Sequence, residues 1–239
     1  MAMKGMILAA GYGTRLAAVH ADLPKPLVPA GGKPMITWAL EALRDAGCSQ
    51  VVVNLHHRAR QLASWLEARD LGLDLTLIYE KDILGTGGGI LNAAEQLRGD
   101  EPFLVCNADT YTAQDLGHVV EFHRARDGIA TLMVNERETR RAVLLDAQHH
   151  FLGKESWFSP ASPPPGGALR RGFCGVHVIS PVIFEQNEGR GFADIFDVYR
   201  RSMQAGASLY GFTSSARWAD LGTPERIRAF EQRAAAPGS

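Results

Sequence analysis

The segment Leu8-Ala9-Ala10-Gly11-Tyr12-Gly13-Thr14-Arg15-Leu16 carries residue types that suit phosphate binding. Gly11 and Gly13 lack a Cβ atom, so the backbone there can turn sharply and present N–H groups to an anion at close range. Arg15 adds a planar guanidinium that matches phosphate oxygens. The apolar run 5–9 just before it predicts a buried central strand, and open α/β sheets bind ligands where such strands end. We interpret this segment as a triphosphate-binding loop.

Glycines at this spacing also occur in ordinary tight turns between a strand and a helix. Lys25 favours the phosphate-binding interpretation, because it lies between Pro24 and Pro26. The two prolines restrict the backbone on either side and hold this long cationic side chain on a stiff segment. A solvated surface lysine needs no such support, so we expect Lys25 to act together with the glycine loop.

Hydrophobic periodicity predicts strands and helices in alternation along the first half of the chain. Apolar runs predict buried strands over 50–55, 74–79 and 101–106, and helical spacing predicts helices over 34–46, 58–69 and from 85 to about 97. This alternation is typical of a doubly wound α/β sheet. The strand over 101–106 ends at Asn107-Ala108-Asp109, which places the Asp109 carboxylate at the expected ligand edge.

The second half has shorter elements around one proline- and glycine-rich loop. We predict strands over 129–134, 142–146, 151–154, 173–179, 207–212 and 217–220, and helices over 114–126, over 194–204 and from Pro224 onward. Prolines and glycines prevent a strand over 159–167, so this segment is predicted to be a mobile loop or lid. We expect one domain over 1–233, with a nucleotide-binding half over 1–112 and a sugar-phosphate-binding half over 113–233, followed by a frayed tail over 234–239.

The motifs together resemble the sugar-1-phosphate nucleotidylyltransferases, whose signature begins L-A-A-G-x-G-T-R and continues to P-K-P-L. The resemblance extends through Leu84-Gly85-Thr86-Gly87-Gly88-Gly89, Asn107-Ala108-Asp109 and Trp218-Ala219-Asp220-Leu221-Gly222-Thr223. It implies a Rossmann-like, doubly wound mixed sheet of the nucleotide-diphospho-sugar transferase (GT-A-like) type. The hexapeptide repeat that builds a β-helix in some relatives is not seen here.

The resemblance also implies roles for individual residues. The expected partners are a nucleoside triphosphate and a sugar 1-phosphate, and the expected cofactor is Mg²⁺ held by Asp109 and Asp220. Lys25 is expected to contact the sugar phosphate and the α-phosphate, and Arg15 the β- and γ-phosphates. Further nucleotide-binding positions are expected at Ala10, Gly11, Gly13, Thr14, Glu80, Gly85, Thr86 and Asn107.

The substrates are a finer question that several features of the sequence leave open. The short chain with Leu84–Gly89 and the closing Trp218–Thr223 is most similar to family members acting on UTP and N-acetylmuramate 1-phosphate in cell-wall recycling. A GTP-dependent enzyme for heptose 1-phosphate or mannose 1-phosphate is the alternative. A non-catalytic nucleotide-binding regulatory module is a third hypothesis. A dehydrogenase is disfavoured, because the loop lacks the third glycine of G-x-G-x-x-G.

Composition excludes several other classes. The chain has 239 residues with a formal net charge of -1, which gives no electrostatic reason to expect nucleic acid or an anionic membrane as partner. No leader or membrane span is seen, so a cytoplasmic location is expected.

The candidate cysteines and histidines are interpreted as structural. The three cysteines Cys48, Cys106 and Cys174 are interpreted as buried apolar residues. The pair His56-His57 is interpreted as a polar loop rather than a metal site, and His177 as a packed residue.

Overall fold

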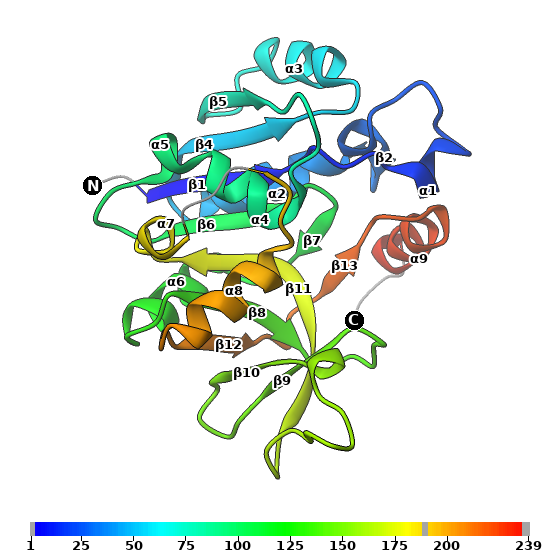
Figure 1. Cartoon of the computed structure of the whole chain (residues 1–239). Coiled ribbons are helices and arrows are strands. Elements are labelled where there is room, and N and C mark those ends of the chain that lie inside the picture. Colours follow the sequence, from blue (N-terminus) through cyan, green and yellow to red (C-terminus); the bar gives the residue numbers. More distant parts are fainter. Residues whose placement is uncertain (1–2, 188–190, 236–239) are drawn as a thin grey trace.

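The computed structural model describes residues 3–187 and 191–235, and within them nine strands form one mixed sheet (Figure 1). Seven lie in the order β10-β9-β11-β6-β1-β4-β5, and β8 and β12 continue from β11 as a branch. The strands are β1 (Met3–Leu8), β4 (Cys48–Leu55), β5 (Asp74–Tyr79), β6 (Phe103–Asn107), β8 (Ala130–Asn135), β9 (Ala142–Leu145), β10 (Phe151–Lys154), β11 (Leu169–Ile179) and β12 (Leu209–Thr213).

Helices cover both faces of this sheet, as a doubly wound fold requires. They are α1 (Thr14–Ala17), α2 (Met35–Asp45), α3 (Ala59–Glu67), α4 (Gly85–Asn92), α5 (Ala94–Leu97), α6 (Leu116–Arg124), α7 (Ile183–Gln186), α8 (Ile195–Gln204) and α9 (Pro224–Ala235), with short 3-10 turns η1 (Lys25–Leu27) and η2 (Glu155–Trp157). The predicted helix from residue 85 to about 97 is therefore divided at Ala93 into α4 and α5. None of the described helices has the length and apolarity to cross a membrane.

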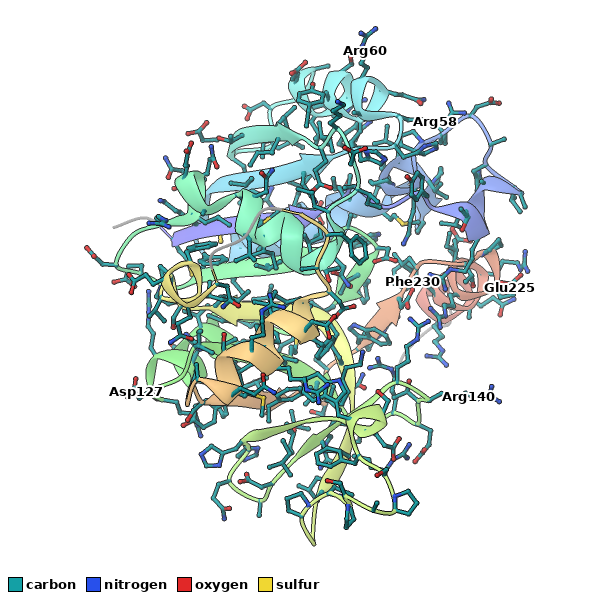
Figure 2. All side chains as sticks on the ribbon, viewed as in Figure 1. Arg58, Arg60, Asp127, Arg140, Glu225 and Phe230 are labelled. Atoms are coloured by element: carbon teal, nitrogen blue, oxygen red, sulfur yellow. The ribbon has the colours of Figure 1, made fainter. Side chains whose placement is uncertain are left out.

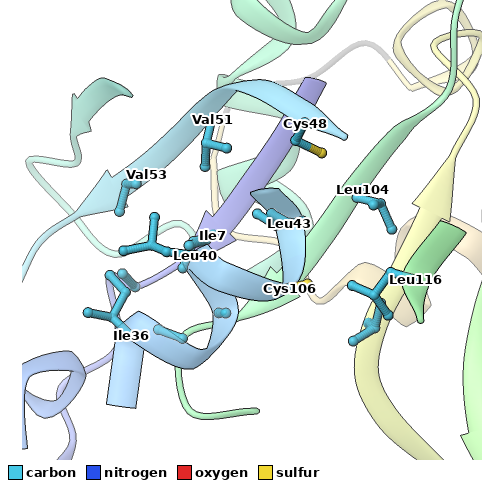
Figure 3. Close-up of a cluster of buried hydrophobic side chains, with 14 of the residues drawn as sticks. Ile7, Ile36, Leu40, Leu43, Cys48, Val51, Val53, Leu104, Cys106 and Leu116 are labelled. Carbon is cyan, nitrogen blue, oxygen red and sulfur yellow. The ribbon is translucent and has the colours of Figure 1, made fainter. Parts of the chain in front are cut away.

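The core lies on the two faces of the central parallel strands, because side chains of a strand alternate between faces. Ile7 of β1 packs with α2, α3 and α6 in one cluster, of which Ile36 and Leu40 are seen in Figure 3. Its neighbour Met6 packs on the opposite face with α4, α7 and α8. Strands β6, β1, β4 and β5 run parallel, and Leu8 pairs with Asn107, so their carboxyl ends meet at one edge.

Strand β11 joins the two halves of the chain into this single sheet. It is antiparallel to β6, β8 and β9, and it begins at Leu169, four residues before the strand predicted from the sequence. The loop over 159–167 lies between η2 and β11, is exposed, and contains a bridge between Ser159 and Ser162. Its mobility stays a prediction. Of the predicted tail, 236–239 lie outside the described residues, and α9 extends to Ala235.

A third, smaller cluster holds together segments that are distant in sequence. It contains Leu16, Val28, Ala30, Met35, Leu221, Ile227 and Phe230. Phe230 of α9, labelled in Figure 2, packs against Trp38 and Tyr111 with ring centroids 5.7 and 4.7 Å away. The glycine loop, the Lys25 segment and the Asp220 segment therefore rest on one apolar support.

Candidate active site

Two short strands bring Asp109 and Asp220 together. Strands β7 (Thr110–Thr112) and β13 (Trp218–Asp220) form an antiparallel ribbon in which Asp220 is paired with Thr110. The backbone amide of Leu221 donates a 2.8 Å hydrogen bond to the carbonyl oxygen of Asp109. Of this ribbon, the sequence predicted only the second strand, over 217–220. It fixes the two aspartates as neighbours at the carboxyl edge of the sheet.

The contacts that a Cβ on Gly222 would make show how close together the polar groups of the site lie. A methyl group there would stand 2.8 Å from Asp220 Oδ1 and 2.9 Å from Asp109 Oδ2. It would also stand 3.2 Å from Nη2 of Arg15. The two carboxylate oxygens are therefore no farther apart than the sum of the first two distances. The absent side chain of Gly222 leaves room between an arginine and two aspartates.

Lys25 and the glycine loop form one unit, as the sequence predicts. Lys25 Nζ forms an ion pair with Asp109 Oδ2, and both side chains are largely shielded from solvent. Gly13 has a φ of +64°, which disfavours a side chain, and a Cβ there would stand 2.6 Å from Cβ of Lys25. Only glycine lets the loop pass this close to the lysine stem.

Arg226 is a member of this site that sequence reasoning missed. Its Nη1 forms an ion pair with Asp220 Oδ2, while the other carboxylate oxygen accepts a 2.8 Å hydrogen bond from the backbone amide of Gly222. Arg226 lies in the first turn of α9, two residues after the predicted helix start at Pro224. Its position on the exposed face of an amphipathic helix gave no signal before the contact was seen.

The donor set is suited to a divalent cation with phosphate ligands. Carboxylate oxygens are the ligands that Mg²⁺ prefers, and the space left by Gly222 lies between two of them. Among the described residues no group of three or more His, Cys, Asp or Glu side chains is placed to hold a metal. A cation bound by Asp109 and Asp220 would therefore take its other ligands from water and phosphate, as Mg²⁺ commonly does. Arg15, Lys25 and Arg226 outnumber the two aspartates, so the site favours an anionic ligand.

The expected nucleotide-binding residues at the loop and strand ends border the same edge. Gly11 and Thr14 are exposed, and Ala10 is buried. Asn107 ends β6, and its Nδ2 would lie 2.9 Å from a Cβ on Gly175. The structure thus places these residues around the carboxyl ends of β1 and β6.

Glu80 has two partners within the chain. Its Oε1 accepts a 2.6 Å hydrogen bond from Asn54 Nδ2, and its Oε2 accepts a 3.0 Å bond from the amide of Leu84. Asn54 in turn accepts a 2.8 Å hydrogen bond from the amide of Ala9. The buried carboxylate thereby ties β4 to the start of the glycine loop. Its contact with a nucleotide stays a prediction.

Gly85 and Thr86 are also used inside the protein. A Cβ on Gly85, whose φ is +70°, would stand 2.6 Å from the carbonyl oxygen of Ala193, and Thr86 Oγ1 accepts a 3.0 Å hydrogen bond from the amide of Ile195. The glycine-rich segment is therefore the close contact between α4 and the start of α8. Packing inside the protein is therefore enough to explain why glycine is needed here. Nucleotide binding by Gly85 and Thr86 stays a prediction.

The remaining titratable candidates are accounted for by packing. His177 is buried with a ring nitrogen 3.0 Å from the Tyr199 hydroxyl, and burial lowers its pKa to about 3, so it is a packed neutral residue as expected. All three cysteines are buried, and burial raises the pKa of the Cys48 and Cys174 thiols to about 12. His56 has its ring nitrogens 3.0 Å from the Glu80 carbonyl oxygen and 3.3 Å from the Tyr12 hydroxyl.

Comparison with known proteins decides the family. The family model described as Nucleotidyl transferase matches residues 4–142, more than half of the chain. The chain belongs to the Nucleotidyl transferase family. The matched residues include the glycine loop, Lys25 and Asp109, whereas Asp220 lies beyond them.

Relatives within the Nucleotidyl transferase family extend the match. The chain is 31% identical over 231 residues to the mannose-1-phosphate guanylyltransferase catalytic subunit beta of Drosophila pseudoobscura pseudoobscura, covering 93% of this chain and 60% of the relative. It is 30% identical over 234 residues to the mannose-1-phosphate guanyltransferase of Pichia angusta, covering 93% and 62%. The chain thus spans about three fifths of the length of these curated relatives.

A solved structure confirms the fold over the whole chain. HddC from Yersinia pseudotuberculosis is 25% identical with a TM-score of 0.77, covering 98% of this chain and 99% of that protein, and one HddC structure is complexed with GMP-PN. The Rossmann-like nucleotidyltransferase fold predicted from the sequence is therefore correct. The finer similarity to N-acetylmuramate-1-phosphate uridylyltransferases stays a prediction, because both curated relatives described above are guanylyltransferases.

Proposed function

We propose that this chain transfers a nucleotidyl group from a nucleoside triphosphate to a sugar 1-phosphate and releases pyrophosphate. The observation that carries the proposal is that Asp109, Asp220 and Arg15 surround the space at Gly222. Lys25 also forms an ion pair with Asp109. This arrangement combines ligands for a cation with cationic partners for phosphates. Membership of the Nucleotidyl transferase family supports the same reaction class.

The residues of the site have complementary tasks in this reaction. An oxygen of the sugar phosphate forms a bond to the α-phosphorus, and the bond from that phosphorus to the bridging oxygen of pyrophosphate breaks, with its electron pair leaving on pyrophosphate. Lys25 and Arg15 oppose the repulsion between the two anionic reactants. The nucleophile is already an anion at neutral pH, so no side chain has to remove a proton.

The proposed cofactor is Mg²⁺ held by Asp109 and Asp220. When bound there, a divalent cation would neutralise charge on the phosphates and help to hold the reacting groups in place. The aspartates are positioned for this by the β7–β13 ribbon and by the Leu221 amide. Gly222 keeps the space between their oxygens open.

Among nucleotides, we infer a preference for GTP. The guanylyltransferase relatives are 30% and 31% identical to this chain over 93% of its length, and HddC has been crystallised with the guanine nucleotide GMP-PN. The corresponding sugar substrate would be mannose 1-phosphate or a heptose 1-phosphate. UTP with N-acetylmuramate 1-phosphate is the other pair suggested by the sequence, and the same experiment tests it.

A substrate panel tests the proposal. The purified protein would be given each of the four ribonucleoside triphosphates with mannose, heptose, glucose and N-acetylmuramate 1-phosphates in Mg²⁺, with pyrophosphate release followed and the product mass determined. We expect the fastest release with GTP. Fastest release with UTP and N-acetylmuramate 1-phosphate would replace the inferred preference. Nucleotide binding by calorimetry without pyrophosphate from any pair would instead indicate a binding module.

A further inference from the structure

Both carboxylate oxygens of Asp220 have partners within the chain. One oxygen accepts the Gly222 amide, and the other forms the ion pair with Arg226. The Asp220 side chain is 34% exposed and that of Arg226 is 49% exposed. An ion pair this exposed typically contributes little, because water and salt screen it, so it can be exchanged for another partner. Arg226 is a counter-ion that a stronger ligand can replace.

The backbone of Arg226 is anchored, whereas its side chain is about half exposed. Helix α9 is anchored by Phe230, which packs on Trp38 and Tyr111. Only Leu221, Gly222 and Thr223 separate Asp220 from the first turn of α9. A released guanidinium would therefore stay beside the site rather than leave it.

Asp109 has an equivalent counter-ion in Lys25. Each of the two carboxylates that could hold a cation thus has a cationic side chain on it. A divalent cation that binds alone has to displace these pairs and meets their repulsion. A cation that binds with a triphosphate meets less opposition, because the phosphate oxygens offer the displaced side chains a new partner.

We propose that Arg226 is a positioning residue that couples cation binding at Asp220 to nucleotide binding. It weakens binding of the cation alone by occupying Asp220, and it strengthens binding of the nucleotide once the cation has released it. This inference rests on the proposed function, because it takes Asp220 as a ligand of the cation. It adds a residue outside the motifs from which that function was inferred.

Calorimetric titrations without sugar phosphate test the inference, because no turnover occurs. Mn²⁺ alone is titrated first, then GTP in excess Mg²⁺. Arg226→Gln should bind Mn²⁺ about two- to fivefold more tightly than the natural protein, the range that an exposed ion pair allows. The same variant should bind GTP in Mg²⁺ several-fold more weakly. Opposite changes in the two affinities are a signature that loss of structure does not produce, since that would weaken both.

Three variants serve as references. Arg228→Gln removes an arginine from the same helix whose partner is Glu225, so both affinities should stay unchanged. Arg226→Lys keeps the charge and should restore most of both. Asp220→Asn should lose Mn²⁺ binding.

The outcomes separate the inference from the proposed function. If Arg226→Gln changes neither affinity, or weakens both, while Asp220→Asn still abolishes Mn²⁺ binding, the coupling role is wrong and the proposed function stands. If Asp220→Asn binds Mn²⁺ as the natural protein does, the cation site is wrong and the inference fails with it. Absence of turnover in the substrate panel would overturn the proposed function independently of these titrations.

Discussion

The backbone amide of Leu221 donates a hydrogen bond to the carbonyl oxygen of Asp109 at 2.8 Å. This bond joins the segment after the central strand β6 to the segment before the C-terminal helix α9. Asp220 is paired with Thr110 in the same ribbon, so backbone hydrogen bonds fix the main chain at both aspartates. A site held in this way is preorganised for a small ion, and substitutions of its side chains should alter chemistry more than folding.

Replacing either carboxylate by its amide is the direct test of this view. Asp109→Asn and Asp220→Asn should each reduce turnover by about a hundredfold or more, because an amide is a neutral and weaker ligand for a divalent cation. Thermal unfolding should change little. The matched control is Asp127→Asn, an exposed aspartate outside the site that is labelled in Figure 2, and it should keep normal turnover. Near-normal rates in either site variant would show that the cation assignment is wrong.

Gly222→Ala should fill the space between the two carboxylates without changing either carboxylate. Its methyl group would stand 2.8 and 2.9 Å from the oxygens of Asp220 and Asp109, closer than carbon and oxygen normally approach. We expect the Mg²⁺ concentration for half-maximal turnover to rise about tenfold or more. Gly166→Ala is the control, since a Cβ at that exposed glycine meets nothing within 4 Å. An unchanged Mg²⁺ dependence in Gly222→Ala would mean that the cation does not use this space.

Gly13→Ala tests whether the glycine loop positions Lys25. The new Cβ would stand 2.6 Å from Cβ of Lys25, so the lysine stem has to move away from Asp109. Turnover should fall about tenfold or more. Gly47→Ala separates this contact from backbone strain, because Gly47 also has a positive φ, of +89°, but a Cβ there meets nothing within 4 Å. If both variants lost turnover equally, the cause would be a side chain at positive φ and not the contact with Lys25.

Much of the fold was predictable because local signals agreed with the global arrangement. The strand over 74–79 was predicted with the bounds observed, since Gly72 and the polar residues 80–82 limit it. The strand over 151–154 was also predicted with the bounds observed. The strand ending at Ile179 was predicted too short, because its first residues, Leu169–Gly172, are largely polar or exposed and become a strand by pairing with β9. Long-range pairing, rather than local preference, makes that part a strand.

For the candidate site, the sequence indicated residue types better than contacts. Arg15, Lys25, Asp109 and Asp220 were predicted together, and the structure brings them together. Arg226 was not predictable, because an arginine in an exposed amphipathic helix has no local pattern that marks its partner. The internal bonds of Glu80 and Thr86 were missed for the same reason, since Asn54 and Ile195 are distant in sequence.

Two buried histidines should make stability fall as the pH is lowered. Burial, with a smaller contribution from Arg124, lowers the pKa of His123 to about 4, and burial lowers that of His177 to about 3, whereas a histidine in the unfolded chain titrates near 6.5. Above pH 6.5 both states are neutral at these residues and stability does not depend on them. Below it only the unfolded state takes up the protons, so the free energy of unfolding should fall by about 1 kcal/mol per histidine per pH unit.

Urea unfolding at several values between pH 7 and pH 5 measures this slope. His123 lies between the Thr131 and Ser180 hydroxyls, 3.0 and 2.9 Å away, so His123→Gln keeps polar groups there but cannot be protonated. It should reduce the slope by about 1 kcal/mol per pH unit, whatever its effect on stability at pH 7. His118→Gln, on the exposed side of the same helix α6, should leave the slope nearly unchanged. The same slope in natural protein and His123→Gln would show that His123 takes up its proton in the folded state as readily as in the unfolded one.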